Sequence, residues 1–151
     1  MSLVAFRGCT SLKQLNVKSV SWVGKWAFGK CKSLQDLSFL NSVKAIDECA
    51  FNGCESIETV ELPDCLTELG IGAFENCTKL RSVRFSKSIQ VIRQNTFKNC
   101  LGLVGLFLPE NIKEIRPWAF EGCSNLKVVK VSKSCKISDK TFPSGTKLEF
   151  Y

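Results

Sequence analysis

The chain has 151 residues, of which 44% are hydrophobic, and its 21 Lys and Arg against 14 Asp and Glu give a formal net charge of +7. Histidine is absent, which excludes Ser-His-Asp and Cys-His nucleophiles and every metal site with a histidine ligand. No apolar run approaches the roughly 18–20 residues of a membrane span, so we expect no membrane insertion. Nothing places two carboxylates in one cleft, and we therefore expect no enzyme, no catalytic residue, no metal and no cofactor.

A dipeptide, Ala-Phe or Thr-Phe, recurs along the chain, and in every copy but the last a cysteine follows the Phe by three residues. The steps between successive Phe residues are 22, 23, 23, 23, 23 and 22. A period in the twenties predicts a solenoid, in which each repeat contacts only its neighbours. The repeats, numbered 1 to 7, begin near Ala5, Ala27, Ala50, Ala73, Thr96, Ala119 and Thr141.

The repeats fill the chain, so we expect residues 1–151 to form one solenoid domain of about six and a half repeats. Met1 leads into repeat 1 within a few residues, without a signal peptide or a polar capping unit. We therefore expect the chain to be a piece of a longer array.

Each repeat is expected to begin with a single helical turn, because the A-F-x-x-C segment is too short for a helix that is stable on its own. The residue before each cysteine is one of Gly8, Lys30, Gly53, Asn76, Asn99 and Gly122. Gly and Asn both tolerate positive φ, so this position is predicted to turn the chain in a left-handed conformation. Lys30 is the exception and should carry mild strain.

Two short apolar patterns follow in each repeat. The first alternates apolar and polar residues, which predicts a strand with one buried face. Its last two apolar positions are Leu15/Val17, Leu37/Phe39, Val60/Leu62, Val83/Phe85, Leu106/Leu108 and Val129/Val131. The second pattern predicts another short strand on the opposite side of the coil. Its residues are Val20/Val23, Val43/Ile46, Leu66/Leu69, Ile89/Ile92 and Ile112/Ile115.

This pattern resembles the BspA-like class of leucine-rich repeats, with its 23-residue unit and A-F-x-x-C core. The resemblance covers residues 5–150, with one residue missing after Val17 and another between Val131 and Ile137. It implies an α/β-type right-handed solenoid of short β-strands and single helical turns. It further implies binding to other proteins, in a family rich in microbial cell-surface adhesins, and it carries no catalytic residue to transfer.

Six of the nine cysteines occupy one column, that is, equivalent positions of successive repeats. Such residues should stack about 4.8 Å apart, as a ladder of small buried thiols. That spacing also permits disulfides, although parallel side chains on identical repeats rarely turn toward each other. Metal binding is not supported, because the spacing bears no relation to paired C-x-x-C motifs. Cys135 is expected at an apolar core position, Cys49 directly precedes an Ala-Phe dipeptide, and Cys65 is expected to be the most exposed. Unpaired cysteines fit a reducing compartment, whereas the resemblance implies the cell surface or secretion, so the location stays open.

Charges are segregated along the chain. Residues 45–78 carry eight acids and no base, whereas residues 79–109 carry six bases and no acid. The period brings the two blocks side by side, which predicts the pairs Glu58–Arg81, Glu61–Arg84, Asp64–Lys87 and Glu75–Lys98. Two columns continue the alternation, as Asp64, Lys87, Glu110, Lys133 and as Glu75, Lys98, Glu121. The charges are thus interpreted as register-fixing pairs, which argues against a nucleic-acid site despite the net charge.

The outward side of repeat 5 differs from the others. Leu101, Val104 and Phe107 replace residues that are polar in the other repeats, and Gly105 leaves space beside them. These three residues, the repeat-5 patch, are predicted to be exposed. A basic rim surrounds them, made of Arg81, Arg84, Lys127 and Lys130. An apolar centre with a charged rim is typical of a protein-binding site. The alternative is that a neighbouring segment or molecule simply covers the patch.

Three functions remain open at this point. The leading hypothesis is a non-enzymatic protein–protein interaction module, adhesin-like by resemblance, that binds a protein ligand through its strand face at the seven residues of the patch and rim. The second is a structural or spacer array that displays another domain. The third is weak binding of acidic polymers, which rests on net charge alone.

Overall fold

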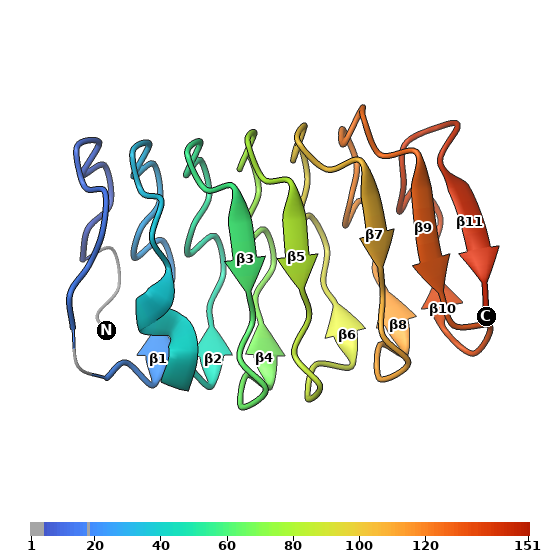
Figure 1. Ribbon diagram of the computed structural model, residues 1–151, viewed down its shortest axis with the longest axis horizontal. Helices are drawn as coiled ribbons and strands as arrows, with labels where there is room; N and C mark the ends of the chain where they lie inside the picture. The colour runs from blue at the N-terminus through green and yellow to red at the C-terminus, as the bar shows by residue number, and fades with distance from the viewer. Residues whose placement is uncertain (1–4, 18) are drawn as a thin grey trace.

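The computed structural model describes residues 5–17 and 19–151. They form a β-solenoid of about six turns with almost no helix. The chain advances steadily along one axis, so repeats 1 and 7 lie at opposite ends of the stack (Figure 1). The predicted repeat architecture is therefore confirmed.

The first strand of each later repeat lies on one side of the coil, which we call the strand face (Figure 1). It contains β3 (Thr59–Glu61), β5 (Ser82–Arg84), β7 (Gly105–Phe107), β9 (Val128–Val131) and β11 (Lys147–Phe150). Pairing is parallel, and β3 aligns with β5, and β7 with β9, in the register that the 23-residue period predicts. The buried and exposed residues alternate as expected for strands with one face in the core.

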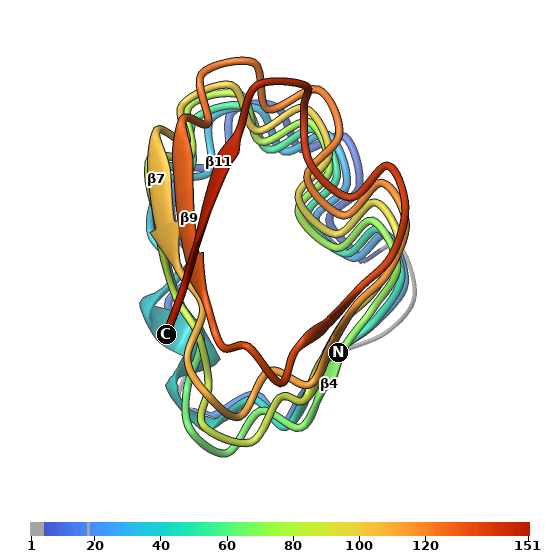
Figure 2. The same ribbon diagram turned by 90° about the vertical axis from the view of Figure 1, so that its right-hand side faces the viewer.

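The second apolar pattern forms the opposite side of the coil (Figure 2). Its strands are β1 (Trp22–Val23), β2 (Ala45–Ile46), β4 (Glu68–Leu69), β6 (Val91–Ile92), β8 (Glu114–Ile115) and β10 (Lys136–Ile137). All ten predicted apolar residues of this side are buried. The prediction of a second short strand is confirmed.

The recurring Phe residues form the centre of the core. Phe28, Phe51, Phe74, Phe97 and Phe120 are fully buried. Successive rings stack nearly parallel, with centroids between 5.1 Å (Phe51–Phe74) and 5.7 Å (Phe74–Phe97) apart. Each ring thus covers its neighbours, and each repeat completes the core of the next.

The A-F-x-x-C segment is tighter than the expected helical turn. Its hydrogen bonds join residues three apart, as from the Gly29 amide to the Trp26 carbonyl (2.9 Å) and from the Cys31 amide to the Phe28 carbonyl (3.0 Å). A residue with a left-handed backbone conformation lies on each side of these turns, so the turns do not continue as an α-helix. All six residues before the cysteines have positive φ as predicted, including Lys30 at 63°.

A second left-handed column was not predicted. It lies directly before the Ala-Phe or Thr-Phe dipeptide and contains Trp26, Cys49, Gly72, Asn95, Trp118 and Lys140, with φ between 54° and 61°. Only Gly and Asn in this set are residue types that favour positive φ. The backbone geometry here is dictated by the turn and by the neighbouring repeats rather than by local preference.

The cysteine column is the predicted ladder of buried thiols. From Cys31 onward, each thiol of the column donates a hydrogen bond to the carbonyl of the Phe in the preceding repeat, for example Cys54 Sγ to the Phe28 oxygen (3.1 Å). All nine cysteines of the chain are unpaired. Cys65 is exposed as expected, but so is Cys9, because repeat 1 has no preceding repeat among the described residues.

Repeat 1 forms no strand where Leu15/Val17 predicted one, and Val17 is exposed. In the later repeats the strand face is interrupted twice. Repeat 2 has a 3₁₀ helix, η1 (Ser38–Ser42), where a strand was predicted, and β5 of repeat 4 forms no pairing with β7. In both repeats the last inward position is a Phe, Phe39 or Phe85, whereas Leu62, Leu108 and Val131 occupy that column in repeats 3, 5 and 6. Phe39 and Phe85 are buried and press against the Phe stack. We attribute both interruptions to the extra volume of these rings.

Candidate functional site

The repeat-5 patch lies at and beside β7 on the strand face. The exposed fractions are 40% for Leu101, 60% for Val104 and 58% for Phe107. Val104 directly precedes β7, and Phe107 is its last residue. The three residues are exposed as the sequence predicted.

Tyr151 covers part of the patch. Its ring stacks on that of Phe107, with centroids 5.5 Å apart and an angle of 14° between the planes. The Tyr151 hydroxyl donates to the Leu108 carbonyl (2.7 Å), and its amide donates to the Val131 carbonyl (3.2 Å). Tyr151 thereby reaches from the end of β11 across β9 to β7. This residue was missed by sequence reasoning, because it lies beyond the last position that the repeat alignment can compare.

The basic rim is divided into two kinds of residue. Arg81 pairs with Glu58 (3.5 Å) and Arg84 with Asp64 (3.4 Å), so both arginines are directed toward repeat 3. Lys127 and Lys130 are exposed on repeat 6, and neither forms an ion pair within the described part of the chain. Lys130 is the register partner of Phe107 on β9. The free positive charge beside the patch therefore comes from the lysines.

A shallow groove runs between β5 and β7 where their pairing is interrupted. Its volume is about 420 Å³, and Val83, Phe85, Leu106, Phe107 and Pro109 supply most of its apolar lining. Arg84 and Lys87 stand at its repeat-4 side. Of the predicted site residues, the structure brings Arg84 and Phe107 together in this groove. Leu101 and Val104 extend the apolar surface beyond it, and Lys127 and Lys130 flank the other side.

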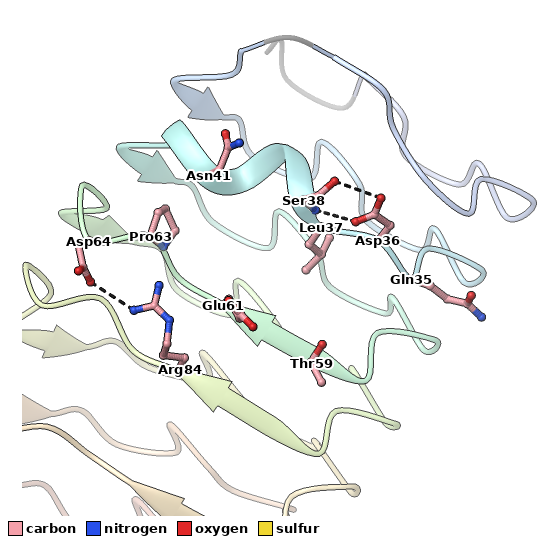
Figure 3. Close-up of a pocket in the computed structure, with 10 residues that line it drawn as sticks. All are labelled: Gln35, Asp36, Leu37, Ser38, Asn41, Thr59, Glu61, Pro63, Asp64 and Arg84. Carbon is pink, nitrogen blue, oxygen red and sulfur yellow. Dashed lines mark hydrogen bonds and ion pairs between the residues drawn. The ribbon is translucent and has the colours of Figure 1, made fainter.

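A second groove lies beside η1, at the other interruption of the strand face (Figure 3). Its volume is about 530 Å³, and its lining combines the apolar Leu37 and Pro63 with polar residues that include Asp36, Asp64 and Arg84. Asp36 accepts hydrogen bonds from the amide and hydroxyl of Ser38 (2.8 and 3.1 Å). The Lys87 amide, followed by the Lys87 and Arg84 charges, lowers the pKa of Asp64. The carboxylates of Asp36 and Asp64 are thus engaged by neighbouring groups of the chain.

The predicted charge pairs are partly correct. Glu58–Arg81 and Asp64–Lys87 (3.5 Å each) form as expected, and Lys98–Glu121 (2.7 Å) forms within the predicted column. The Glu61–Arg84 pair was wrong, because Arg84 reaches Asp64 instead.

Glu75 also has a different partner from the predicted Lys98. Its Oε2 atom accepts a hydrogen bond from the side chain of Asn52 (3.1 Å), while Lys98 pairs with Glu121. Burial raises the pKa of Glu75. A long basic side chain can thus reach more than one acid on the neighbouring repeats. The period alone does not determine which acid it pairs with.

Two buried thiols in the middle of the ladder, Cys54 and Cys77, are not activated as nucleophiles. Burial raises the pKa of the Cys54 and Cys77 thiols well above their usual value, which keeps them protonated at neutral pH. No cluster of three or more potential metal ligands occurs among residues 5–17 and 19–151. Over the same described ranges, no helix has the length and apolarity that crossing a membrane requires.

Stacked parallel strands, inward apolar columns and a fixed period define a leucine-rich-repeat solenoid. A family model described as the BspA type leucine rich repeat region matches residues 2–104 and 45–150. The chain belongs to this family of BspA-type leucine-rich repeats. Proteins with this repeat and fold are typically not enzymes. No curated protein matches the chain.

Several solved bacterial structures are similar. A leucine-rich repeat protein of T. pallidum is 36% identical with a TM-score of 0.67, over 80% of this chain and 56% of that one. The chain thus spans little more than half of that relative. A leucine-rich cell surface protein of Faecalibacterium prausnitzii is 19% identical, with a TM-score of 0.59 over 98% of this chain and 74% of that one. The pneumococcal vaccine antigen PcpA is 19% identical, with a TM-score of 0.60 over 87% of this chain and 36% of that one. The last two show the fold alone.

Proposed function

We propose that this chain is a protein-binding module whose ligand contacts the strand face at repeat 5. The observation that carries the proposal is the repeat-5 patch, in which three adjacent outward positions are 40–60% exposed and apolar. Apolar exposed residues are ordinary when they are single, but a contiguous group is typical of an interaction site. Lys127 and Lys130 would form part of a polar rim around it.

We further propose that the module acts at the cell surface, in the manner of an adhesin. The support is the description of the Faecalibacterium prausnitzii structure as a cell surface protein, together with the family membership. The long strand face suits this role, because a stack of repeats offers an extended surface for a large ligand.

A selection from a random peptide library displayed on phage tests the proposal. The immobilised chain is the target, and a Phe107→Glu variant is the counter-target. The matched control is Asn16→Glu, which places the same charge at the same column of repeat 1, where the residue is also exposed.

Ligands selected on the unmodified chain should bind the Asn16→Glu variant equally well and lose at least tenfold in affinity for Phe107→Glu. The Asn16→Glu variant should unfold at the same temperature as the unmodified chain, and Phe107→Glu at a slightly lower temperature, because it loses the contact with the Tyr151 ring. Ligands that bind all three proteins alike would refute the proposed site. A failure to select any ligand at this face would favour the spacer function instead.

A further inference from the structure

The opening between β5 and β7 exposes more than side chains. Neighbouring strand pairs are bridged by backbone hydrogen bonds, such as that from the Leu108 amide to the Lys130 carbonyl (2.9 Å) and that from the Leu62 amide to the Arg84 carbonyl (2.9 Å). No such bond joins β5 to β7 in the described structure. The facing edges of these two strands therefore leave backbone N–H and C=O groups that polar groups of a ligand crossing the strands can bind.

The groove between them accepts one large apolar side chain. Val83, Phe85, Leu106 and Pro109 line it, and Phe107 forms one edge. Its volume of about 420 Å³ is ample for a single aromatic or large aliphatic group. Phe107 remains 58% exposed although Tyr151 stacks on it, so its ring is available to such a group. The groove thus offers an apolar anchor point next to open strand edges.

Positive charge stands on both sides of this anchor point. On repeat 4, Lys87 has its side chain 82% exposed and shares the single carboxylate of Asp64 with Arg84. On repeat 6, Lys127 and Lys130 form no ion pair within the described residues, because Glu149, which lies opposite Lys130 on β11, pairs with Lys147. The lining of the groove itself contains Arg84 and Lys87 but no acid. A ligand complementary to the groove is therefore acidic as well as apolar.

We infer that the groove between β5 and β7 binds an extended peptide segment in which one aromatic or large aliphatic residue is flanked by acidic residues. The inference rests on the proposed function and specifies its ligand. Repeats 4 and 6 are two strand spacings apart, or about 10 Å. An extended chain rises about 3.3 Å per residue, so the two acids are expected three positions apart, with the apolar residue between them.

A synthetic peptide of sequence Gly-Ser-Asp-Phe-Ser-Asp-Ser-Gly is the probe, titrated into the chain and followed by chemical shifts of the backbone amides. Binding should shift the amides of β5 and β7. Replacing Phe by Ala in the peptide, or both Asp by Asn, should each weaken binding at least fivefold. A Lys127→Glu, Lys130→Glu double variant should weaken binding at least tenfold, and higher salt should weaken it as well. Lys13→Glu is the control, because Lys13 occupies the Lys127 column in repeat 1.

The outcomes separate this inference from the proposed function. If the peptide shifts no amides of β5 and β7, or if the Asn peptide binds as tightly as the Asp peptide, the inferred ligand is wrong. The proposed function then still stands, provided that library ligands depend on Phe107. If a nucleic acid or an acidic polysaccharide binds more tightly than the peptide and independently of Phe107, the inference is overturned in favour of a purely electrostatic surface.

Discussion

Phe85→Leu tests whether the extra volume of one ring opens the strand face. Phe85 is 5% exposed and meets Phe97 edge-on, with centroids 5.8 Å apart. Leucine occupies this column in repeats 3 and 5, and the strand of each of these repeats pairs with the strand of the next repeat, β3 with β5 and β7 with β9. The substitution should therefore allow β5 and β7 to pair.

The expected energies nearly cancel. Losing the aromatic contact costs about 0.5–1.5 kcal/mol, and the smaller buried area costs about a further 1 kcal/mol. Two or three new backbone hydrogen bonds would contribute about 0.5–1.5 kcal/mol each. The free energy of unfolding should change by less than about 1 kcal/mol, as the sum of these opposing terms. In the control, Phe74→Leu, two stacked contacts at 5.1 and 5.7 Å are lost and no bond is gained, so the cost should be about 2–4 kcal/mol.

Urea denaturation measures both stabilities, and amide hydrogen exchange measures the new pairing. In Phe85→Leu the amides of β7 should exchange at least tenfold more slowly. If Phe85→Leu is as destabilising as Phe74→Leu and the exchange of β7 is unchanged, then the Phe85 ring is not what separates the strands.

Three further predictions follow from the turns and the cysteine ladder. Gly102→Ala should lower the free energy of unfolding by about 1–3 kcal/mol in urea denaturation, because a Cβ at this position would lie 2.5 Å from the Leu80 carbonyl oxygen. The control, Gly105→Ala, should be nearly neutral, because its Cβ would meet only Val128, at 3.4 Å from Cγ1 and 3.6 Å from the carbonyl oxygen. Lys30→Asn should stabilise by about 0.5–1 kcal/mol, because φ is 63°; a loss of stability would mean that Lys30 is unstrained. Ellman's reagent at pH ~8 should react quickly with the exposed Cys9 and Cys65, and with the ladder thiols only after unfolding; rapid reaction of Cys77 would contradict its burial.

The fold was predictable because one physical constraint repeats. The Phe spacing predicted the stack of repeats and the register of β7 with β9, and the Gly and Asn residues before the cysteines predicted a left-handed position there. Each of these features depends on a position that recurs in every repeat, so the same residue pattern indicates it several times.

Features that occur once were harder to predict. The effect of Phe39 and Phe85 on strand pairing depends on how much side-chain volume fits in the core between neighbouring repeats. The residue pattern of the sequence does not show this volume. The partner of Arg84 was wrong because a long side chain reaches several acids. Tyr151 was missed because its contact with Phe107 joins residues that the period does not relate. The exposure of the repeat-5 patch was predictable, because three outward positions that are polar in the other repeats are all apolar in repeat 5.

The most direct test of binding at repeat 5 is photo-crosslinking from Val104. A p-benzoylphenylalanine replaces Val104 in one variant and Gln35, at the same column of repeat 2, in another. Each variant is irradiated with a ligand selected on the unmodified chain. Binding at the repeat-5 patch predicts strong crosslinking from position 104 and little from position 35. Equal crosslinking from both positions, or stronger crosslinking from position 35, would contradict it.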